Sequence, residues 1–223
     1  MSEYAFNLDD REVYRYLGYG GIVPKEGCDA EIKNRIERIE GELTRAAEPR
    51  AIWKYYPLTV PEEGVLKLGD IRVKSESLLR NLKGCNEVCM LAVTIGPAPD
   101  RFMQRARYTE AGSEYFYQAI GAAMVEEYAD HINEVIRQEA QTRGLYLRPR
   151  FSPGYGDFDI EHQRDFAAVL NMAKEIGITL TDSCMMVPTK SITAVIGLSQ
   201  SDTRCPVAGC ETCNKSDTCI FKR

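Results

Sequence analysis

The most constraining stretch of this sequence is a continuous apolar run from Val88 to Ile95 that ends at Gly96-Pro97. Side chains alternate between the two faces of a β-strand, so a strand that is apolar at every position has both faces covered. A chain of 223 residues with 44% apolar content is able to build a core of that kind. We therefore expect a strand buried on both faces.

Further strands are expected on the N-terminal side of this run. Between Ile52 and Val73, three short segments rich in aromatic and β-branched residues are separated by Pro, Glu and Gly-Asp, a pattern typical of antiparallel strands. Ser75 is placed to cap a helix that Gly84 ends, and an amphipathic helix is expected after Asp29.

A long helical region is predicted on the C-terminal side, over residues 99–142, with a break near Gly112. Small residues at 119 and 121–123 would let its second part pack closely on neighbouring elements. That part also carries Glu126 and Glu127. The helix pattern alone indicates two solvated acids, with Glu127 nearer the buried stripe.

Charge and composition exclude several functions. The chain has 28 basic and 33 acidic residues, a net charge of −5, which gives no general attraction to nucleic acid or to an anionic membrane. No run approaches the roughly 18 apolar residues of a membrane span, and the N-terminus lacks the pattern of a secretory signal. We expect a cytoplasmic protein.

The segment Arg150-Phe151-Ser152-Pro153-Gly154-Tyr155 combines a cation, a hydroxyl, a rigid turn and an aromatic ring. A strand over residues 145–151 would place Arg148 and Arg150 on one face. Pro153-Gly154 suits the central positions of a type II turn, because Pro fixes φ and Gly permits a positive φ. The residues alone leave two interpretations open, a turn of purely structural value and a ligand site in which Arg150 holds a carboxylate or phosphate.

This segment and the run that follows it resemble a known family. About 25 residues after RFSPGY comes LTDSCMMVPTKSIT, and Ile176–Ser183 matches the family element I-G-(I/V)-x-L-T-(E/D)-S. Together with an R-x-(S/A)-P-G-Y turn and an M-x-P-x-x-S strand, these residues are similar to the activation domain of cobalamin-dependent methionine synthase. The resemblance is specific from about Ala119 to Ala194.

The resemblance implies both a fold and a function. The fold is α+β, a twisted antiparallel sheet with flanking helices. The family binds S-adenosylmethionine while docked on a cobalamin domain, where inactive cob(II)alamin is reduced by an external electron donor and then methylated. Arg150 would hold the methionine carboxylate, the backbone around Ser152 and Gly154 would meet the adenosine portion, and Tyr155 would shape the pocket near the sulfonium. The preceding helix contributes an acidic contact at Glu126.

The chain departs from the family in ways that limit this transfer. Gly156–His162 replaces a stretch with Cys and Pro, and the tyrosine-bearing strand expected beyond Gly197 is missing. Neither His131 nor His162 lies in an Asp-x-His-x-x-Gly cobalamin-ligating signature, so each is interpreted as an ordinary polar or surface residue. We expect residues 1–200 to be a freestanding activation-like domain, with no catalytic residue of its own, that serves cobalamin-dependent methionine synthase or another corrinoid methyltransferase.

A cysteine-rich tail is expected at residues 201–223. Its four thiols, at Cys205, Cys210, Cys213 and Cys219, have ligand-like spacing for Zn or an iron–sulfur cluster, although the last interval is unlike a plant-type ferredoxin. A reactive or partly disulfide-linked tail and a disordered thiol-rich tail remain alternatives. Earlier in the chain, Cys85 and Cys89 are interpreted as buried structural thiols, because no His accompanies them.

Two rival functions remain on sequence grounds. In the first, the protein is a metal-binding or iron–sulfur electron-transfer accessory protein whose function resides in the tail. In the second, it is a pure interaction module in which RFSPGY is only a structural turn. An ATP-driven activator is disfavoured because there is no G-x4-G-K-(S/T) loop. In the favoured hypothesis, a flavodoxin or ferredoxin supplies the electron.

Overall fold

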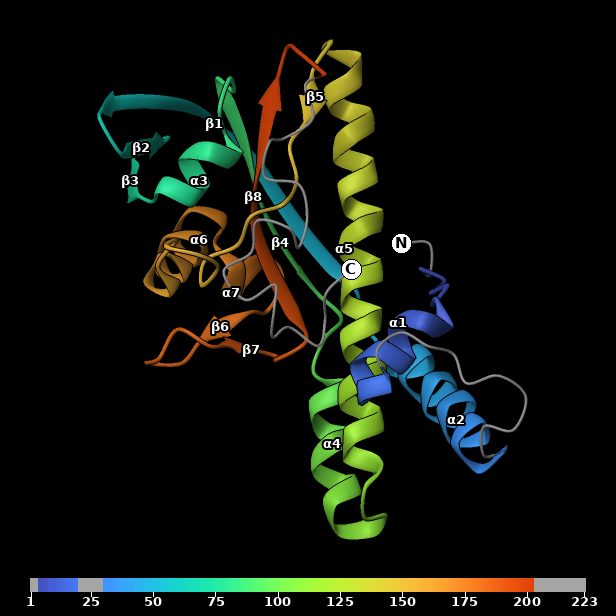
Figure 1. The fold of residues 1–223 in the computed structure, drawn as a ribbon. Coiled ribbons are helices and arrows are strands. Elements are labelled where there is room, and N and C mark those ends of the chain that lie inside the picture. The colour runs from blue at the N-terminus through green and yellow to red at the C-terminus, as the bar shows by residue number, and fades with distance from the viewer. Residues whose placement is uncertain (1–3, 20–29, 203–223) are drawn as a thin grey trace.

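A six-stranded antiparallel sheet organises residues 4–19 and 30–202, the part of the chain that the computed structural model describes (Figure 1). Its strand order is β3-β2-β1-β4-β8-β5. The strands are β1 (Arg50–Glu62), β2 (Val65–Leu68), β3 (Ile71–Lys74), β4 (Glu87–Thr94), β5 (Tyr146–Leu147) and β8 (Ser191–Ser199). A separate hairpin pairs β6 (Thr179–Leu180) with β7 (Met186–Val187). The predicted α+β class with an antiparallel sheet is confirmed.

Strand β4 lies between two hydrophobic cores, as its unbroken apolar sequence predicts. Cys89, Leu91 and Val93 point into the core shared with the long helices. The alternate residues, Val88, Met90 and Ala92, point into the opposite core. Because side chains alternate along a strand, both layers need apolar residues from the interior of β4, from Val88 to Val93.

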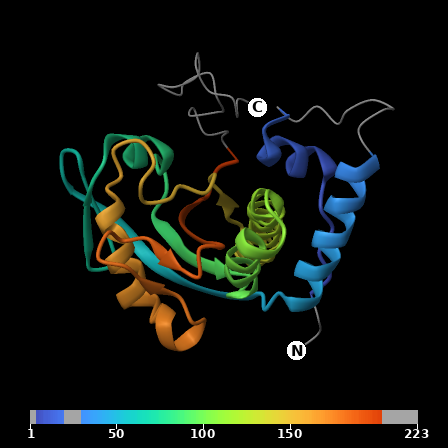
Figure 2. The same cartoon turned by 90° about the horizontal axis from the view of Figure 1, so that it is seen from below.

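Helices cover both faces of the sheet. One layer contains α1 (Asp10–Tyr14), a π-helical turn η1 (Arg15–Tyr19), α2 (Ala30–Ala46), α4 (Ala98–Thr109) and α5 (Ser113–Thr142). The other contains α3 (Glu76–Asn81), a 3₁₀ turn η2 (Ile160–His162), α6 (Gln163–Leu170) and α7 (Met172–Glu175). Figure 2 looks along α5 and shows this helix between the sheet and the N-terminal helices. Helix α5 therefore contacts most of the elements that form the candidate site.

Several predicted boundaries are found where the sequence places them. Gly112 separates α4 from α5 with φ of 87°, a conformation that residues with a Cβ rarely adopt. Ser75 caps α3, since its side chain accepts a hydrogen bond from the amide of Leu78. These local signals depend only on neighbouring residues, which explains why sequence reasoning finds them.

The thiols in the described part of the chain are buried and form no disulfide with one another. They are Cys85, Cys89 and Cys184. Burial raises the pKa of the Cys89 thiol, and the negative charges of Glu139 and Glu87 raise it further. The thiol therefore stays protonated. The prediction of buried structural thiols at Cys85 and Cys89 is confirmed. Across residues 4–19 and 30–202, no helix is long and apolar enough to cross a bilayer.

Candidate functional site

The RFSPGY segment forms a tight turn beside strand β8. Phe151 is joined to Val195 of β8 by two backbone hydrogen bonds, of 2.9 and 2.8 Å. The carbonyl of Ser152 then accepts from the amide of Tyr155 at 3.2 Å, and Gly154 has φ of 93°. A positive φ at the third position and a proline at the second are the features of a type II turn, as predicted.

The strand leading into this turn differs from the prediction. Leu147 pairs with Leu198 and Phe151 pairs with Val195, so four steps along this segment oppose three along β8. One extra residue of this kind is a bulge, and it reverses the facing of every side chain beyond it. The expectation that Arg148 and Arg150 share a face is therefore wrong.

The two arginines consequently serve different layers of the protein. Arg148 is buried and donates to the carbonyl of Lys83 at 3.3 Å, on the α3 side of the sheet. Arg150 instead turns towards α5. Because of the bulge, Arg148 points into the interior, whereas Arg150 lies at the sheet edge next to α5, the helix that carries the predicted acidic contact Glu126.

Arg150 and Glu126, two of the predicted contacts, are neighbours in the structure. Nη2 of Arg150 donates to Oε2 of Glu126 at 3.1 Å and to Oδ1 of Asp130 at 2.8 Å. The Arg150 side chain is 21% exposed, against 40% for Glu126 and 75% for Asp130. Its Nη1 has no hydrogen-bond partner among the described residues. The guanidinium is therefore held by two carboxylates through Nη2, while its buried Nη1 has no acceptor.

An acidic cavity of about 250 Å³ adjoins this cluster, between α5 and the N-terminal segment. Its lining includes five carboxylates, at Asp9, Glu12, Glu126, Glu127 and Asp130. Burial raises the pKa of the nearby Tyr16 phenol, and the charge of Glu126 adds to that rise. A concentration of negative charge at this depth favours a cationic group.

The turn contributes fewer free backbone groups than the sequence suggests. The amide of Gly154 donates to the carbonyl of Phe158 at 2.7 Å, and the Ser152 carbonyl already accepts from Tyr155. A carbonyl oxygen has a second lone pair, so Ser152 can accept one more hydrogen bond. The Tyr155 side chain is 67% exposed and extends from the turn into solvent.

Residue Asp157 fixes the far side of the turn to helix α3. Its Oδ1 accepts from the Ser75 hydroxyl at 2.7 Å and from the Ser77 amide at 3.0 Å, and its Oδ2 accepts from the Glu76 amide at 2.7 Å. Burial acts against the charged form, but these hydrogen bonds outweigh it and lower the pKa of Asp157. The segment that departs from the family pattern therefore supplies a helix cap.

Sequence reasoning missed Asp130 and the two N-terminal acids of the cavity. A signal for Asp130 was present, because residues four apart on a helix lie on one face and Glu126 was already a candidate. Asp9 and Glu12 gave no such signal, since their approach to α5 depends on the tertiary fold. The predicted metal ligands Cys205, Cys210, Cys213 and Cys219 lie outside the described residues. Within the described residues, no cluster of three or more His, Cys, Asp or Glu could hold a metal ion.

Comparison with known proteins gives two positive results. Residues 80–211, more than half of the chain, match the profile of the family described as vitamin B12 dependent methionine synthase, activation domain. Among solved structures, the chain is similar to the crystal structure of the MetH reactivation domain bound to AdoHcy, with a TM-score of 0.61 and 14% identity over 86% of this chain and 76% of that one. The search of curated proteins found no significant match.

Proposed function

Because the chain belongs to the family of the vitamin B12 dependent methionine synthase activation domain, we propose that it binds S-adenosylmethionine and supports the reactivation of a cobalamin-dependent methyltransferase. The partner's cobalamin, reduced by an external electron donor, would supply the cobalt that accepts the methyl group of the sulfonium, and S-adenosylhomocysteine would be the other product. The chain itself contributes binding and orientation, which raise the effective concentration of the methyl donor at cobalt.

The observation that carries this proposal is the contact of Arg150 with Glu126 and Asp130 at the sheet edge. The amino-acid end of S-adenosylmethionine is a zwitterion, with a carboxylate beside an ammonium. Arg150 would exchange a protein carboxylate for that of the ligand, and a forked guanidinium binds a carboxylate through two hydrogen bonds. Glu126 and Asp130 would then face the ammonium.

The acidic cavity supports the same orientation of the ligand. The sulfonium adds a second positive charge, and the five carboxylates of the cavity make this side of α5 negative. The adenosine portion would extend towards the backbone of Ser152 and Gly154, and the exposed Tyr155 ring would shape the pocket near the sulfonium. These residues remain proposed contacts.

Titration calorimetry with two ligands tests the role of Arg150. We expect Arg150→Ala to weaken the binding of S-adenosylmethionine by about 1.5–3 kcal/mol, the scale of a hydrogen bond to a charged group. Binding of 5′-methylthioadenosine, which lacks the amino-acid group, should change little. Arg101→Ala is the matched control, because Arg101 is exposed and has no ion pair with a described residue. Equal losses for both ligands would refute the assignment of Arg150 to the carboxylate.

The partner requires a functional assay. We propose cobalamin-dependent methionine synthase or another corrinoid methyltransferase, served by an electron donor such as a flavodoxin or ferredoxin. The purified chain should restore turnover to an inactivated partner only when S-adenosylmethionine and a reductant are both present. Restoration without S-adenosylmethionine would favour the rival electron-transfer function.

The cysteine tail also remains a proposal. Cys205, Cys210, Cys213 and Cys219 would bind Zn or an iron–sulfur cluster, since four thiolates can complete a tetrahedral site. Anaerobic purification followed by metal analysis and visible spectroscopy tests this idea. A colourless and metal-free protein with full affinity for S-adenosylmethionine would exclude the tail from the function while leaving the donor site intact.

A further inference from the structure

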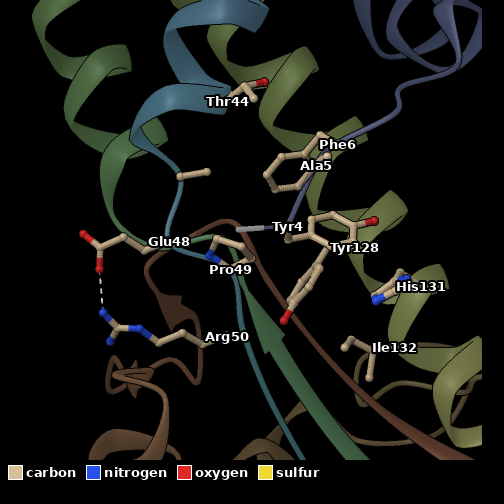
Figure 3. Close-up of a pocket in the computed structure, with 11 residues that line it drawn as sticks. Tyr4, Ala5, Phe6, Thr44, Glu48, Pro49, Arg50, Tyr128, His131 and Ile132 are labelled. Carbon is tan, nitrogen blue, oxygen red and sulfur yellow. Dashed lines mark hydrogen bonds and ion pairs between the residues drawn. The ribbon is translucent and has the colours of Figure 1, made fainter. Parts of the chain in front are cut away.

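A second cavity lies on another side of α5, away from Arg150. It has a volume of about 860 Å³ and lies where the N-terminal segment, the end of α2 and the start of β1 meet the helix. Figure 3 shows its lining residues, with Tyr4 and Phe6 from the N-terminal segment and Tyr128, His131 and Ile132 from α5. Small-molecule sites commonly have about 300–1,000 Å³, so this cavity is of sufficient size.

Aromatic side chains form much of the wall. The Tyr4 ring lies 5.0 Å from the Tyr128 ring and 4.7 Å from the His131 ring, measured between centroids. Phe6 meets the edge of Tyr4 at 5.0 Å. The position of Tyr4 is fixed from its other end, because its hydroxyl donates to Glu127 at 2.6 Å. The wall is therefore a preformed aromatic surface, which favours planar ligands.

The hydroxyl of Tyr128 is an unpaired polar group in the lining of this cavity. Tyr128 is only 8% exposed, and no hydrogen bond joins its hydroxyl to another described residue. The hydroxyl is not among the fully buried unpaired atoms, so a ligand can still reach it. Burial raises the pKa of this phenol, so it remains a donor at neutral pH.

The charged groups at the rim already compensate each other. Arg50 donates to Glu48 at 2.5 Å, and Figure 3 draws this pair at one side of the cavity. Because this pair is already compensated, it offers no unpaired charge to an ionic ligand. From these observations we propose that the cavity binds an uncharged planar aromatic or heteroaromatic molecule whose polar atom hydrogen-bonds the Tyr128 hydroxyl. The proposal is independent of the function assigned to the Arg150 site.

Binding of 2-naphthol, followed by its fluorescence, tests the proposal on the full chain. One molecule should bind per chain, and an excess of S-adenosylmethionine should not displace it. The substitution Tyr128→Phe removes only the hydroxyl and should weaken 2-naphthol about fivefold, the value of one neutral hydrogen bond. The affinity of 2-methylnaphthalene, which has no hydroxyl, should not change.

A second variant localises the binding. Ala47 lines the cavity, so Ala47→Trp would fill it and should abolish the binding of both compounds. Circular dichroism establishes that this variant is folded, and Tyr128→Phe decides the matter if it is not. Three results would overturn the proposal: no binding to the unaltered chain, equal affinity for 2-naphthol in Tyr128→Phe, or complete displacement by S-adenosylmethionine.

Discussion

Two cations contact helix α5 about two turns apart, and their surroundings differ. Arg150 faces the carboxylates of Glu126 and Asp130. Lys190 is only 4% exposed, and its Nζ donates to the neutral amide oxygen of Gln118 at 2.7 Å. Its stem passes so close to Gly121 that a Cβ there would lie 3.1 Å from Cε. Two carboxylates compensate the charge of Arg150, whereas the ammonium of Lys190 is hydrogen-bonded only to a neutral amide and forms no ion pair with a described residue.

This difference separates a group suited to exchange partners from one that is structural. Burial lowers the pKa of Lys190 to about 8, although the charge of Asp100 acts in the opposite direction. Keeping that ammonium charged in the fold therefore costs free energy. Arg150 lies at a partly open edge among carboxylates, where a ligand carboxylate could replace one of its partners at little cost.

The largest effect is expected from Lys190→Met, which should raise the free energy of unfolding at pH 7 by about 2–3 kcal/mol. A shift from an unfolded pKa near 10.5 to about 8 corresponds to roughly 3 kcal/mol, less the lost hydrogen bond to Gln118. In the unaltered chain, the unfolded state binds more protons than the folded state between these pKa values, so stability rises from pH 8 to about 10.5. The advantage of the variant should shrink over that window.

Urea unfolding at pH 7 and at pH 10 measures both parts of this prediction. Lys174→Met is the matched control, because Lys174 is exposed and should show neither effect. A destabilised Lys190→Met variant at pH 7 would mean that the ammonium is better compensated than a single amide oxygen allows.

Much of the fold and of the candidate site follows from local sequence signals. The rest depends on contacts between segments far apart in the sequence. The apolar run of β4, the break at Gly112 and the Pro153-Gly154 turn are encoded within a few residues, so they were predicted. The opposite facing of Arg148 and Arg150 was not, because the bulge is defined by the register against β8, more than 40 residues later.

The two cations illustrate the same limit. The resemblance named Glu126 and Arg150 as separate ligand contacts, and their hydrogen bond is seen only in the fold. The burial of Lys190 contradicts the ordinary exposure of lysine and depends on the small side of α5 at Gly121. The cavity at Tyr128 was also missed. Its aromatic wall includes Tyr4, which lies over 120 residues from Tyr128 and gives no pattern in the sequence.

An intermediate effect is expected at Asp157, a carboxylate compensated by three donors. Asp157→Ala should lower the free energy of unfolding by about 1–2 kcal/mol, the usual range for a helix cap. Because the folded pKa lies below the unfolded one, this stabilisation is present above about pH 4 and is lost as the pH falls further. Thermal melts at pH 7 and pH 3 test this prediction. The difference in melting temperature between the variant and the unaltered protein should be smaller at pH 3. Asp70→Ala, at a fully exposed carboxylate, is the control.

The smallest effect on stability is expected from Arg150→Met, with a sign opposite to that of Lys190→Met. Removing this cation leaves Glu126 and Asp130 unpaired, but both are partly hydrated, so the loss should stay near 0.5 kcal/mol. Urea unfolding at pH 7, alongside Lys190→Met, measures the two changes under one condition. A loss of about 3–5 kcal/mol, the scale of a broken buried pair, would mean that Arg150 stabilises the fold itself. A small loss joined to a large loss of S-adenosylmethionine affinity would instead identify a cation whose position serves the ligand more than the fold.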